Sequence, residues 1–307
     1  MKSGFLVMVT AWFALGCGAD TSSAVQGTGK VQVFVVPEDS IVDGLTAGSG
    51  PENVKDGWTV SYKRFLVAAG NFRAYRSSAP ADRIEAKGVT VIDLVTAPAS
   101  GVVLATFDGV TAARFDKVGF DLANASATST GAKGLPKEDL DRMVQNGWSL
   151  YVEAELTKAT GQSCPRGDAT KCKPAPKVTI AWGVTAGTSY DDCAPEQGDS
   201  GFAVPLGGTV AVKPTIHGDH WFFTNVTHGA ELTERRAQWI ADCDLDLDGT
   251  VTLDELGKVK KEEVFDPAVY SIADASVVTA RDYFVSQART LGDFQGDGEC
   301  PTRKSLP

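Results

Sequence analysis

Short apolar runs that alternate with polar residues recur from about residue 30 to residue 217, and they constrain the fold more than any other feature of the sequence. Clusters of Gly, Pro, Asp and Asn separate these runs, and the chain holds 32 Gly and 14 Pro. Such alternation is typical of half-buried antiparallel strands, and no strand–helix–strand rhythm is present. We therefore predict a mainly β fold, an antiparallel β-sandwich. The predicted strands cover 30–36, 58–69, 88–95, 102–107, 114–125, 148–159, 177–184 and 209–217.

Helical patterns are few and lie mostly near the C-terminus. One predicted helix covers 136–146, where a Pro stands early and Gly147 follows the end. Three more are predicted at 231–243, 253–265 and 275–290. Because this C-terminal part is too small to bury a core alone, we expect a helical insert or appendage on the sandwich.

The N-terminus has the features of an export signal. Residues 1–16 hold an early Lys and then an apolar run too short to span a bilayer, as in a secretory signal peptide. The stretch 14–17, Ala-Leu-Gly-Cys, resembles the lipobox of bacterial lipoproteins, in which the Cys is acylated; an ordinary signal peptide cleaved nearby is the alternative. We therefore expect a cell-envelope protein anchored to the membrane by lipid on Cys17, with a flexible tether over 17–29. By resemblance to the sorting rules of enteric lipoproteins, Gly18 rather than Asp after the Cys favours the outer membrane.

The remaining cysteines are expected to form disulfides, because an exported chain meets oxidising conditions. An odd number remains, so one must stay free or pair elsewhere. A local bridge is expected around the polar insert PRGDATK, and a second bridge is expected to anchor the C-terminal tail through either of two partners. No CxxC motif supports a thioredoxin-like centre or a zinc ribbon. In chain order these residues are Cys164 and Cys172 for the local bridge, then Cys193 or Cys243 as the partner of Cys300.

The charge balance limits the classes of partner. Asp and Glu number 39 against 29 Lys and Arg, which gives a formal net charge of -10. An acidic chain of this kind argues against nucleic-acid binding and against a basic membrane-surface patch. It is compatible with the binding of cations.

The most specific motif is the segment from Asp244 to Glu255, which reads DLDLDGTVTLDE. It matches the EF-hand calcium loop, with Asp at positions 1, 3 and 5, Gly at position 6 and Glu at position 12. Calcium takes about six to eight oxygen ligands, and Gly249 allows the sharp turn that aims the carboxylates inward. The predicted ligands are Asp244, Asp246, Asp248, Thr250 through its carbonyl, Thr252 directly or through a water, and Glu255.

A second segment, from Asp293, copies the spacing of only the first half of that loop. Position 9 is Pro301 and position 12 is Lys304, so a complete second calcium site is not expected. A single hand favours a structural or moderate-affinity site over a cooperative sensor.

All three histidines fall between residues 217 and 228. On an extended chain His217 and His220 would project to opposite faces, but a turn at 218–219 would bring both onto one ion. Imidazoles suit zinc, copper or iron, and Asp219 and His228 are further candidate ligands. The alternative interpretation is that these are ordinary loop histidines at the end of a strand.

Sequence signatures of catalysis are absent. The chain contains no GxSxG, HExxH, phosphate loop or strand-linked GxGxxG motif. We therefore expect a non-enzymatic protein.

Three further segments stand out: Asp56-Gly57-Trp58 before SYKRFLV, TIHGDHWFF at 215–223, and TLGDFQGDGEC at 290–300. Through them the whole chain resembles EF-hand-bearing lipoproteins of the kind found in myxobacteria. The resemblance implies a β-sandwich in which the His-containing strand lies near the C-terminal Gly-rich turn, and it implies no activity.

Together these features predict a calcium-binding lipoprotein of the cell envelope, with a copper- or zinc-binding protein as one alternative. A surface adhesion or assembly module that binds a protein or a glycan is the other. The predicted organisation is a signal peptide at 1–16, a tether at 17–29, a β-sandwich at 30–228, an EF-hand helix–loop–helix at 229–270, and a C-terminal helix and tail packed on the sandwich at 271–307.

Overall fold

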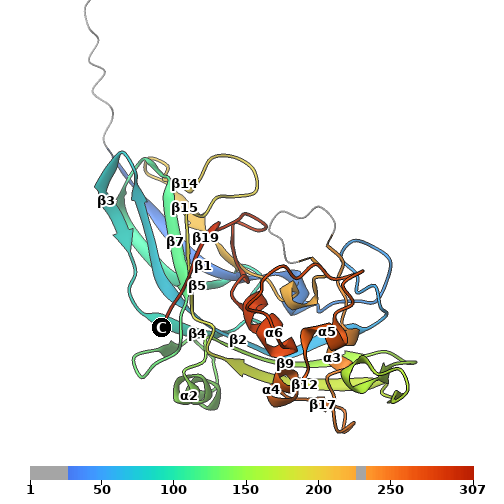
Figure 1. Ribbon diagram of the computed structural model, residues 1–307. Coiled ribbons are helices and arrows are strands. Elements are labelled where there is room, and N and C mark those ends of the chain that lie inside the picture. The colour runs from blue at the N-terminus through green and yellow to red at the C-terminus, as the bar shows by residue number, and fades with distance from the viewer. Residues whose placement is uncertain (1–26, 226–232) are drawn as a thin grey trace, which may run out of the picture.

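The computed structural model describes residues 27–225 and 233–307, and its fold is mainly β (Figure 1). The predicted signal peptide, Cys17 and His228 lie outside the described residues. None of the helices in the described ranges is both long and apolar enough to span a bilayer.

The larger sheet has ten strands, and seven of them lie side by side in the order β17-β12-β9-β2-β7-β13-β19. The long strand β2 pairs with β9 along its first half and with β7 along its second, so it holds the sheet together. β3 and β4 also pair with β2, and β8 pairs with β4. The strands are β2 (Thr59–Arg76), β3 (Ala79–Glu85), β4 (Val89–Asp93), β7 (Lys117–Leu122), β8 (Thr130–Gly131), β9 (Leu150–Thr157), β12 (Lys177–Val184), β13 (Thr188–Asp191), β17 (Thr250–Val251) and β19 (Thr302–Ser305).

The smaller sheet has five strands in the order β15-β1-β16-β18, with β5 on β1. Two further ladders, β10 with β11 and β14 with β6, have two strands each. These strands are β1 (Thr28–Pro37), β5 (Val102–Thr111), β15 (Thr209–Val212), β16 (Pro214–Ile216), β18 (Gly292–Phe294), β10 (Gln162–Ser163), β11 (Lys173–Pro174), β14 (Phe202–Ala203) and β6 (Arg114–Phe115).

A purely antiparallel sandwich is not confirmed, because both sheets are mixed. β1 pairs in parallel with β15 and with β16, and β12 pairs in parallel with β17. Parallel pairing requires a long crossover between strands, and most of the chain lies between β1 and β15. Local alternation in the sequence carries no information on which distant strands become neighbours.

All eight predicted strand segments contain strands, whereas several short strands outside them were not predicted, and β3 is the longest of these. β3 (Ala79–Glu85) alternates between half-buried and exposed residues, several of them charged, and it pairs only with β2 at the edge of the sheet. An edge strand with one neighbour does not need an apolar face, so it lacks the signal that identified the others.

The predicted helix at 136–146 is confirmed as α2 (Lys137–Asn146). Gly147 caps it in the left-handed conformation, and its N–H donates to the carbonyls of Met143 and Val144. The helix packs on one face of the large sheet, where Met143 and Tyr151 are buried. The opposite face of β9 buries Leu150 and Val152 in the main core.

The C-terminal helices gather beside β9, β12 and β17 at one end of the large sheet (Figure 1). They are α3 (Gln238–Ala241), α4 (Leu253–Lys258), α5 (Lys261–Val264) and α6 (Ala280–Ala288), and the N-terminal part of the chain adds the short α1 (Asp39–Val42). α3 and α4 are shorter than the predicted helices at 231–243 and 253–265. A long first helix cannot form, because backbone hydrogen bonds tie Glu234 and Arg236 to Thr224 and Phe222, and the carboxylate of Asp56 caps the start of α3.

The disulfides follow one of the predicted pairings. Cys164 bonds Cys172 across the polar insert, and Cys193 bonds Cys300, which fastens the C-terminal tail beside β13. Cys243 is the free thiol among the described cysteines, and it is buried.

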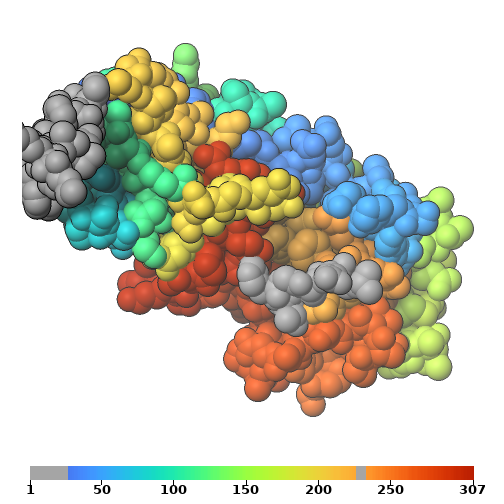
Figure 2. Space-filling view, turned by 90° about the horizontal axis from the view of Figure 1, so that it is seen from above, coloured from blue at the N-terminus to red at the C-terminus, as the bar shows by residue number. Residues whose placement is uncertain are grey.

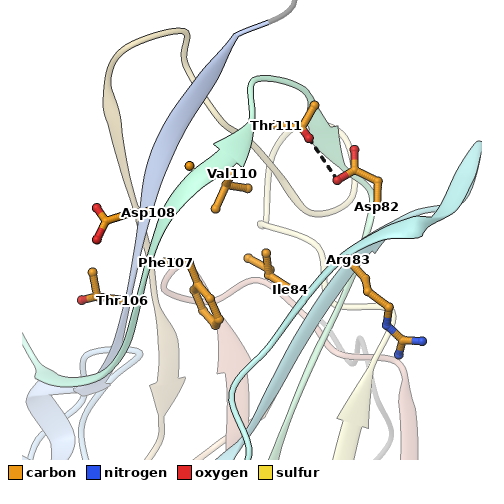
Figure 3. Close-up of a pocket in the computed structure, with 9 residues that line it drawn as sticks. Asp82, Arg83, Ile84, Thr106, Phe107, Asp108, Val110 and Thr111 are labelled. Carbon is orange, nitrogen blue, oxygen red and sulfur yellow. Dashed lines mark hydrogen bonds between the residues drawn. The ribbon is translucent and has the colours of Figure 1, made fainter.

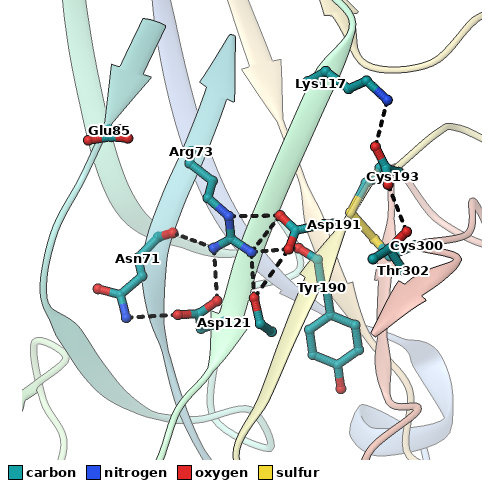
Figure 4. A network of polar contacts seen from close by, with 12 residues as sticks. Asn71, Arg73, Glu85, Lys117, Asp121, Tyr190, Asp191, Cys193, Cys300 and Thr302 are labelled. Carbon is teal, nitrogen blue, oxygen red and sulfur yellow. Dashed lines mark hydrogen bonds and ion pairs between the residues drawn. A yellow bond between two sulfur atoms is a disulfide. The ribbon is translucent and has the colours of Figure 1, made fainter. Parts of the chain in front are cut away.

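A polar network joins three central strands of the large sheet (Figure 4). The guanidinium of Arg73 on β2 donates to Asp121 on β7 at 2.8 Å and to Asp191 on β13 at 2.8 Å. It also donates to Ser189, and Asn71 donates to Asp121. Because every charge in this group has a partner, we interpret the network as a structural tie rather than a binding site.

Candidate metal centre

A tight turn after β16 brings two histidines together. Gly218 leaves no room for a side chain, since a Cβ there would lie 2.5 Å from Cγ1 of Ile41. Its N–H donates to Ser40 Oγ at 3.0 Å, and its carbonyl accepts the hydroxyl of Tyr62. The turn leads into the 3-10 helix η2 (His220–Phe222), and the rings of His217 and His220 lie 5.0 Å apart between centroids.

Asp219 completes a group of three donors. One nitrogen each of His217 and His220 and one oxygen of Asp219 all lie within 4.8 Å of one another. Asp219 is fully buried, and its Oδ1 has no hydrogen-bond partner. Its Oδ2 accepts from Nε of Arg235 at 2.6 Å. Burial and the charge of Glu38 raise the pKa of Asp219 to about 6, against the opposing effect of Arg235.

Arg235 reaches this position because its segment is docked on a distant loop. Val54 forms a β-bridge with Arg235, and the two segments, blue and orange, lie side by side on one face (Figure 2). The guanidinium also contacts Glu52 and the carbonyl of Pro51. The loop around Pro51 and Glu52 therefore orients Asp219 through the side chain of Arg235.

His217 lies between two carboxylates. Its Nδ1 is 3.1 Å from Oε2 of Glu38, and its Nε2 is 3.1 Å from Oδ2 of Asp293. His217 is only 6% exposed, and its Nε2 makes no hydrogen bond in spite of that short distance. Two ligands that each stand about 2.0–2.1 Å from a tetrahedral ion are separated by roughly 3.3 Å, so the spacing of Nε2 and Asp293 suits a shared cation.

The charge states of the two histidines differ. Burial acts to lower the pKa of His217, but the adjacent carboxylates of Asp293 and Glu38 outweigh it and raise that pKa well above its usual value. Burial lowers the pKa of His220, and the nearby charge of His217 lowers it further. His220 is therefore neutral at pH 7, which is the form that binds metals.

Thr290 fixes the tautomer of His220. The Thr290 hydroxyl donates to the carbonyl of Gln287 at 2.8 Å, so its proton is already used. His220 Nδ1, at 2.7 Å, must then donate to Thr290 Oγ1. Nε2 consequently keeps its lone pair for a ligand bond.

The C-terminal turn belongs to this centre rather than to a second calcium loop. Asp293 on β18 is 5% exposed, and its Oδ1 has no hydrogen-bond partner. One donor atom each of Glu38, His217 and Asp297 also lie within 4.8 Å of one another. Sequence reasoning did not identify Glu38 as part of the site, because nothing local marks a residue that comes from the far end of β1.

Internal hydrogen bonds hold the predicted calcium loop in a tight turn. Asp244 Oδ2 accepts from the N–H of Gly249 at 3.0 Å, and Asp248 Oδ1 accepts from the N–H of Thr250 at 2.7 Å. Gly249 has a φ of 84°, which favours glycine. The Glu255 carboxylate accepts from Leu245 N–H at 2.9 Å, so the two ends of the loop are joined.

Three of the predicted calcium ligands converge. Asp244, Asp246 and Glu255 each offer an oxygen within 4.8 Å of the others, whereas Asp248 is exposed outside this group. Asp244 is 1% exposed, and its Oδ1 has no hydrogen-bond partner. Burial raises the pKa of Asp244, and the carboxylates of Glu255 and Asp248 raise it further.

The two predicted threonine ligands lie on β17 and directly after it, where the loop docks on the sheet. Thr250 and Val251 form β17, which pairs with Thr179 and Ile180 of β12. Thr252 caps α4, since its hydroxyl accepts from the N–H of Glu255 at 3.2 Å. The pairing with β12 fastens the loop to the edge of the large sheet.

A hollow of about 400 Å³ opens elsewhere, between β3 and β5 (Figure 3). Ile84, Phe107 and Val110 line it. Its acidic residues already have partners, because Asp82 accepts from Thr111 and Asp108 pairs with Lys30. We find no chemistry in this hollow to match that of the histidine centre.

No protein-family model matches the chain, and no curated protein matches it in sequence. Among solved structures, the chain is similar to MbnP from Methylosinus trichosporium, with 8% identity over 62% of this chain and 76% of that chain. The TM-score is 0.29, so this likeness assigns neither a fold family nor a function.

Proposed function

We propose that this protein is a non-enzymatic metal-binding protein of the cell envelope with two separate cation sites. One is the histidine centre, formed by His217, Asp219, His220 and Asp293, which would hold a transition-metal ion. The other is the loop 244–255, which would hold calcium. The observation that carries the proposal is the buried Asp219, whose Oδ1 has no hydrogen-bond partner, in one cluster of donors with His217 and His220.

The donor chemistry separates the two ions. Two imidazole nitrogens and two carboxylates suit zinc or copper(II), and the described residues add no thiolate, because the free Cys243 lies beside the calcium loop. Unpaired buried polar atoms are costly, and a bound cation would satisfy them. The hydrogen bonds of Thr290 and Arg235 would hold His220 and Asp219 in place, as outer partners do in metal sites.

Calcium in the loop would have a structural role. Its ligands are all oxygens; the buried Asp244 has an Oδ1 without a hydrogen-bond partner, and one of its oxygens lies within 4.8 Å of Asp246 and Glu255. A lone exported hand is expected to bind with a Kd of about 10⁻⁴ to 10⁻³ M. We further interpret the two mixed sheets as a β-sandwich to which calcium fixes the short helices α3 and α4.

The membrane anchor is a separate part of the proposal. We propose export and acylation of Cys17, with the protein held at the outer membrane. Metabolic labelling with palmitate tests this, and the label should be lost in Cys17→Ser. Label that persists in that variant would contradict the anchor without affecting either metal site.

Metal analysis of protein purified without a polyhistidine tag tests the histidine centre. We expect stoichiometric zinc or copper in the wild type and its loss in the His217→Ala, His220→Ala double variant. The calcium-dependent rise in melting temperature should persist in that variant, which shows that it is folded. Equal transition-metal content in both proteins would refute the assignment.

A further inference from the structure

The helix α6 connects the calcium loop to the histidine centre. At its N-terminal end, Ala280 N–H donates to the carbonyl of Val259 at 2.9 Å, directly after α4. Lys261 N–H donates to the carbonyl of Val278 at 3.0 Å, which joins the same two segments again. The helix that leaves the calcium loop is therefore tied to the start of α6.

The residues that follow α6 contact the histidine centre at three points. Thr290 Oγ1 is 2.7 Å from His220 Nδ1. The carbonyl of Leu291 accepts the N–H of His217 at 3.0 Å, and Asp293 Oδ2 is 3.1 Å from Nε2 of the same residue. α6 has nine residues and is thus about 14 Å long. A displacement of this short rod would move a proposed ligand and the group that fixes another.

A buried aromatic path runs parallel to the helix. Trp182 Nε1 donates to the carbonyl of Val251, at position 8 of the calcium loop, at 2.7 Å. The Trp182 ring contacts Phe284 of α6 at 4.7 Å between centroids, and Phe284 contacts Trp221 at 5.3 Å. Trp221 follows His220 in the chain. All three rings are fully buried, and a close-packed interior transmits small displacements.

We propose that calcium in the loop 244–255 increases the affinity of the histidine centre for a transition-metal ion, through α6 and the Trp182–Phe284–Trp221 contacts. This inference rests on the proposed function of both sites. By linkage, the transition metal must increase calcium affinity by the same factor. Coupling of this kind typically amounts to about 5- to 150-fold in affinity.

Calorimetric titration of the full-length protein in detergent, with zinc as the probe, tests the inference. Calcium is removed with a chelating resin, because a soluble chelator would compete for zinc. We expect the zinc Kd to fall at least about fivefold in saturating calcium, and the calcium Kd to fall by the same factor in saturating zinc.

Trp182→Phe removes the hydrogen bond to Val251 and keeps an aromatic ring. Both ions should therefore still bind, while the factor by which each ion changes the Kd of the other falls toward one. Trp148→Phe is the matched control, because Trp148 stacks on Tyr151 outside the path and should leave the coupling unchanged.

The outcomes separate this inference from the proposed function. If both ions bind and the zinc Kd is the same with and without calcium, the coupling is overturned and the two sites stand. Equal coupling in the wild type and in both tryptophan variants overturns the route through Trp182. Failure of either ion to bind overturns the proposed function and the coupling together.

Discussion

Replacement of Glu255 by Gln should remove the calcium response of this protein. Glu255 occupies position 12 of the loop, where calcium takes both carboxylate oxygens. In the structure the same carboxylate accepts three hydrogen bonds, from Leu245 N–H at 2.9 Å and from the N–H and hydroxyl of Thr252 at 2.8 Å. The amide of Gln has one acceptor oxygen, so it can accept from Leu245 or from Thr252 but not from both. Its NH2 group would then face the remaining N–H donor.

The magnitude follows from these two roles. Hydrogen bonds to a charged group contribute about 1.5–3 kcal/mol each, and partial replacement by the amide should cost about 1–2 kcal/mol without calcium. The wild type gains about 2.7 kcal/mol when calcium is in hundredfold excess over its Kd, and the variant should gain almost none. The two proteins should therefore differ by about 4 kcal/mol in calcium. In a chain of this size that corresponds to roughly 10 °C in melting temperature.

Thermal melts followed by circular dichroism, without calcium and with stepwise calcium, measure both parts. Asp254→Asn is the matched control, because Asp254 is the exposed neighbour at position 11 and the charge change is the same. The control should keep the full calcium shift. A calcium shift in Glu255→Gln as large as that of the wild type would refute the assignment of the loop.

Three further predictions concern stability. Replacing Cys193 and Cys300 with Ala should lower the free energy of urea unfolding by about 4.7 kcal/mol, because the bridge spans a sequence separation of 107. Loss of the local bridge, with a separation of 8, should lower it by about half as much. Equal losses would contradict the loop-entropy reasoning. Arg73→Met should cost about 2 kcal/mol by the same assay, since it leaves two carboxylates of the central network without their cation, and an unchanged midpoint would count against the structural role. Burial would raise the pKa of Glu38, but the paired His217 lowers it to about 2, and the pKa of His217 is raised in turn. The pairing of these two side chains should therefore stabilise the metal-free protein fully between about pH 4.5 and 6.5. This stability should be lost as pH falls toward 2 or rises through the folded pKa of His217, and a His217→Gln variant whose melting temperature follows the same pH profile would refute it.

The sequence predicted those parts of the molecule that depend on local pattern. The helix ended by Gly147 and the strand segments are each encoded within about a dozen neighbouring residues. The turn at Gly218 was also predictable, because two histidines three positions apart need such a turn to face one another.

The parts that escaped prediction depend on contacts between distant segments. Glu38 and Asp293 flank His217 only because β1 and β18 both pair with β16. Asp293 carried a signal that pointed elsewhere, since its spacing copies half of a calcium loop. The short α3 likewise reflects contacts with Asp56, far away in the sequence.

X-ray absorption spectroscopy of the zinc-loaded protein tests the central claim most directly. The account predicts a first shell of nitrogen and oxygen at about 2.0–2.1 Å, with the outer-shell scattering of two imidazoles that disappears in the His217→Ala, His220→Ala variant. A sulfur shell at about 2.3 Å, or a shell of oxygen alone, would contradict the assignment of the histidine centre.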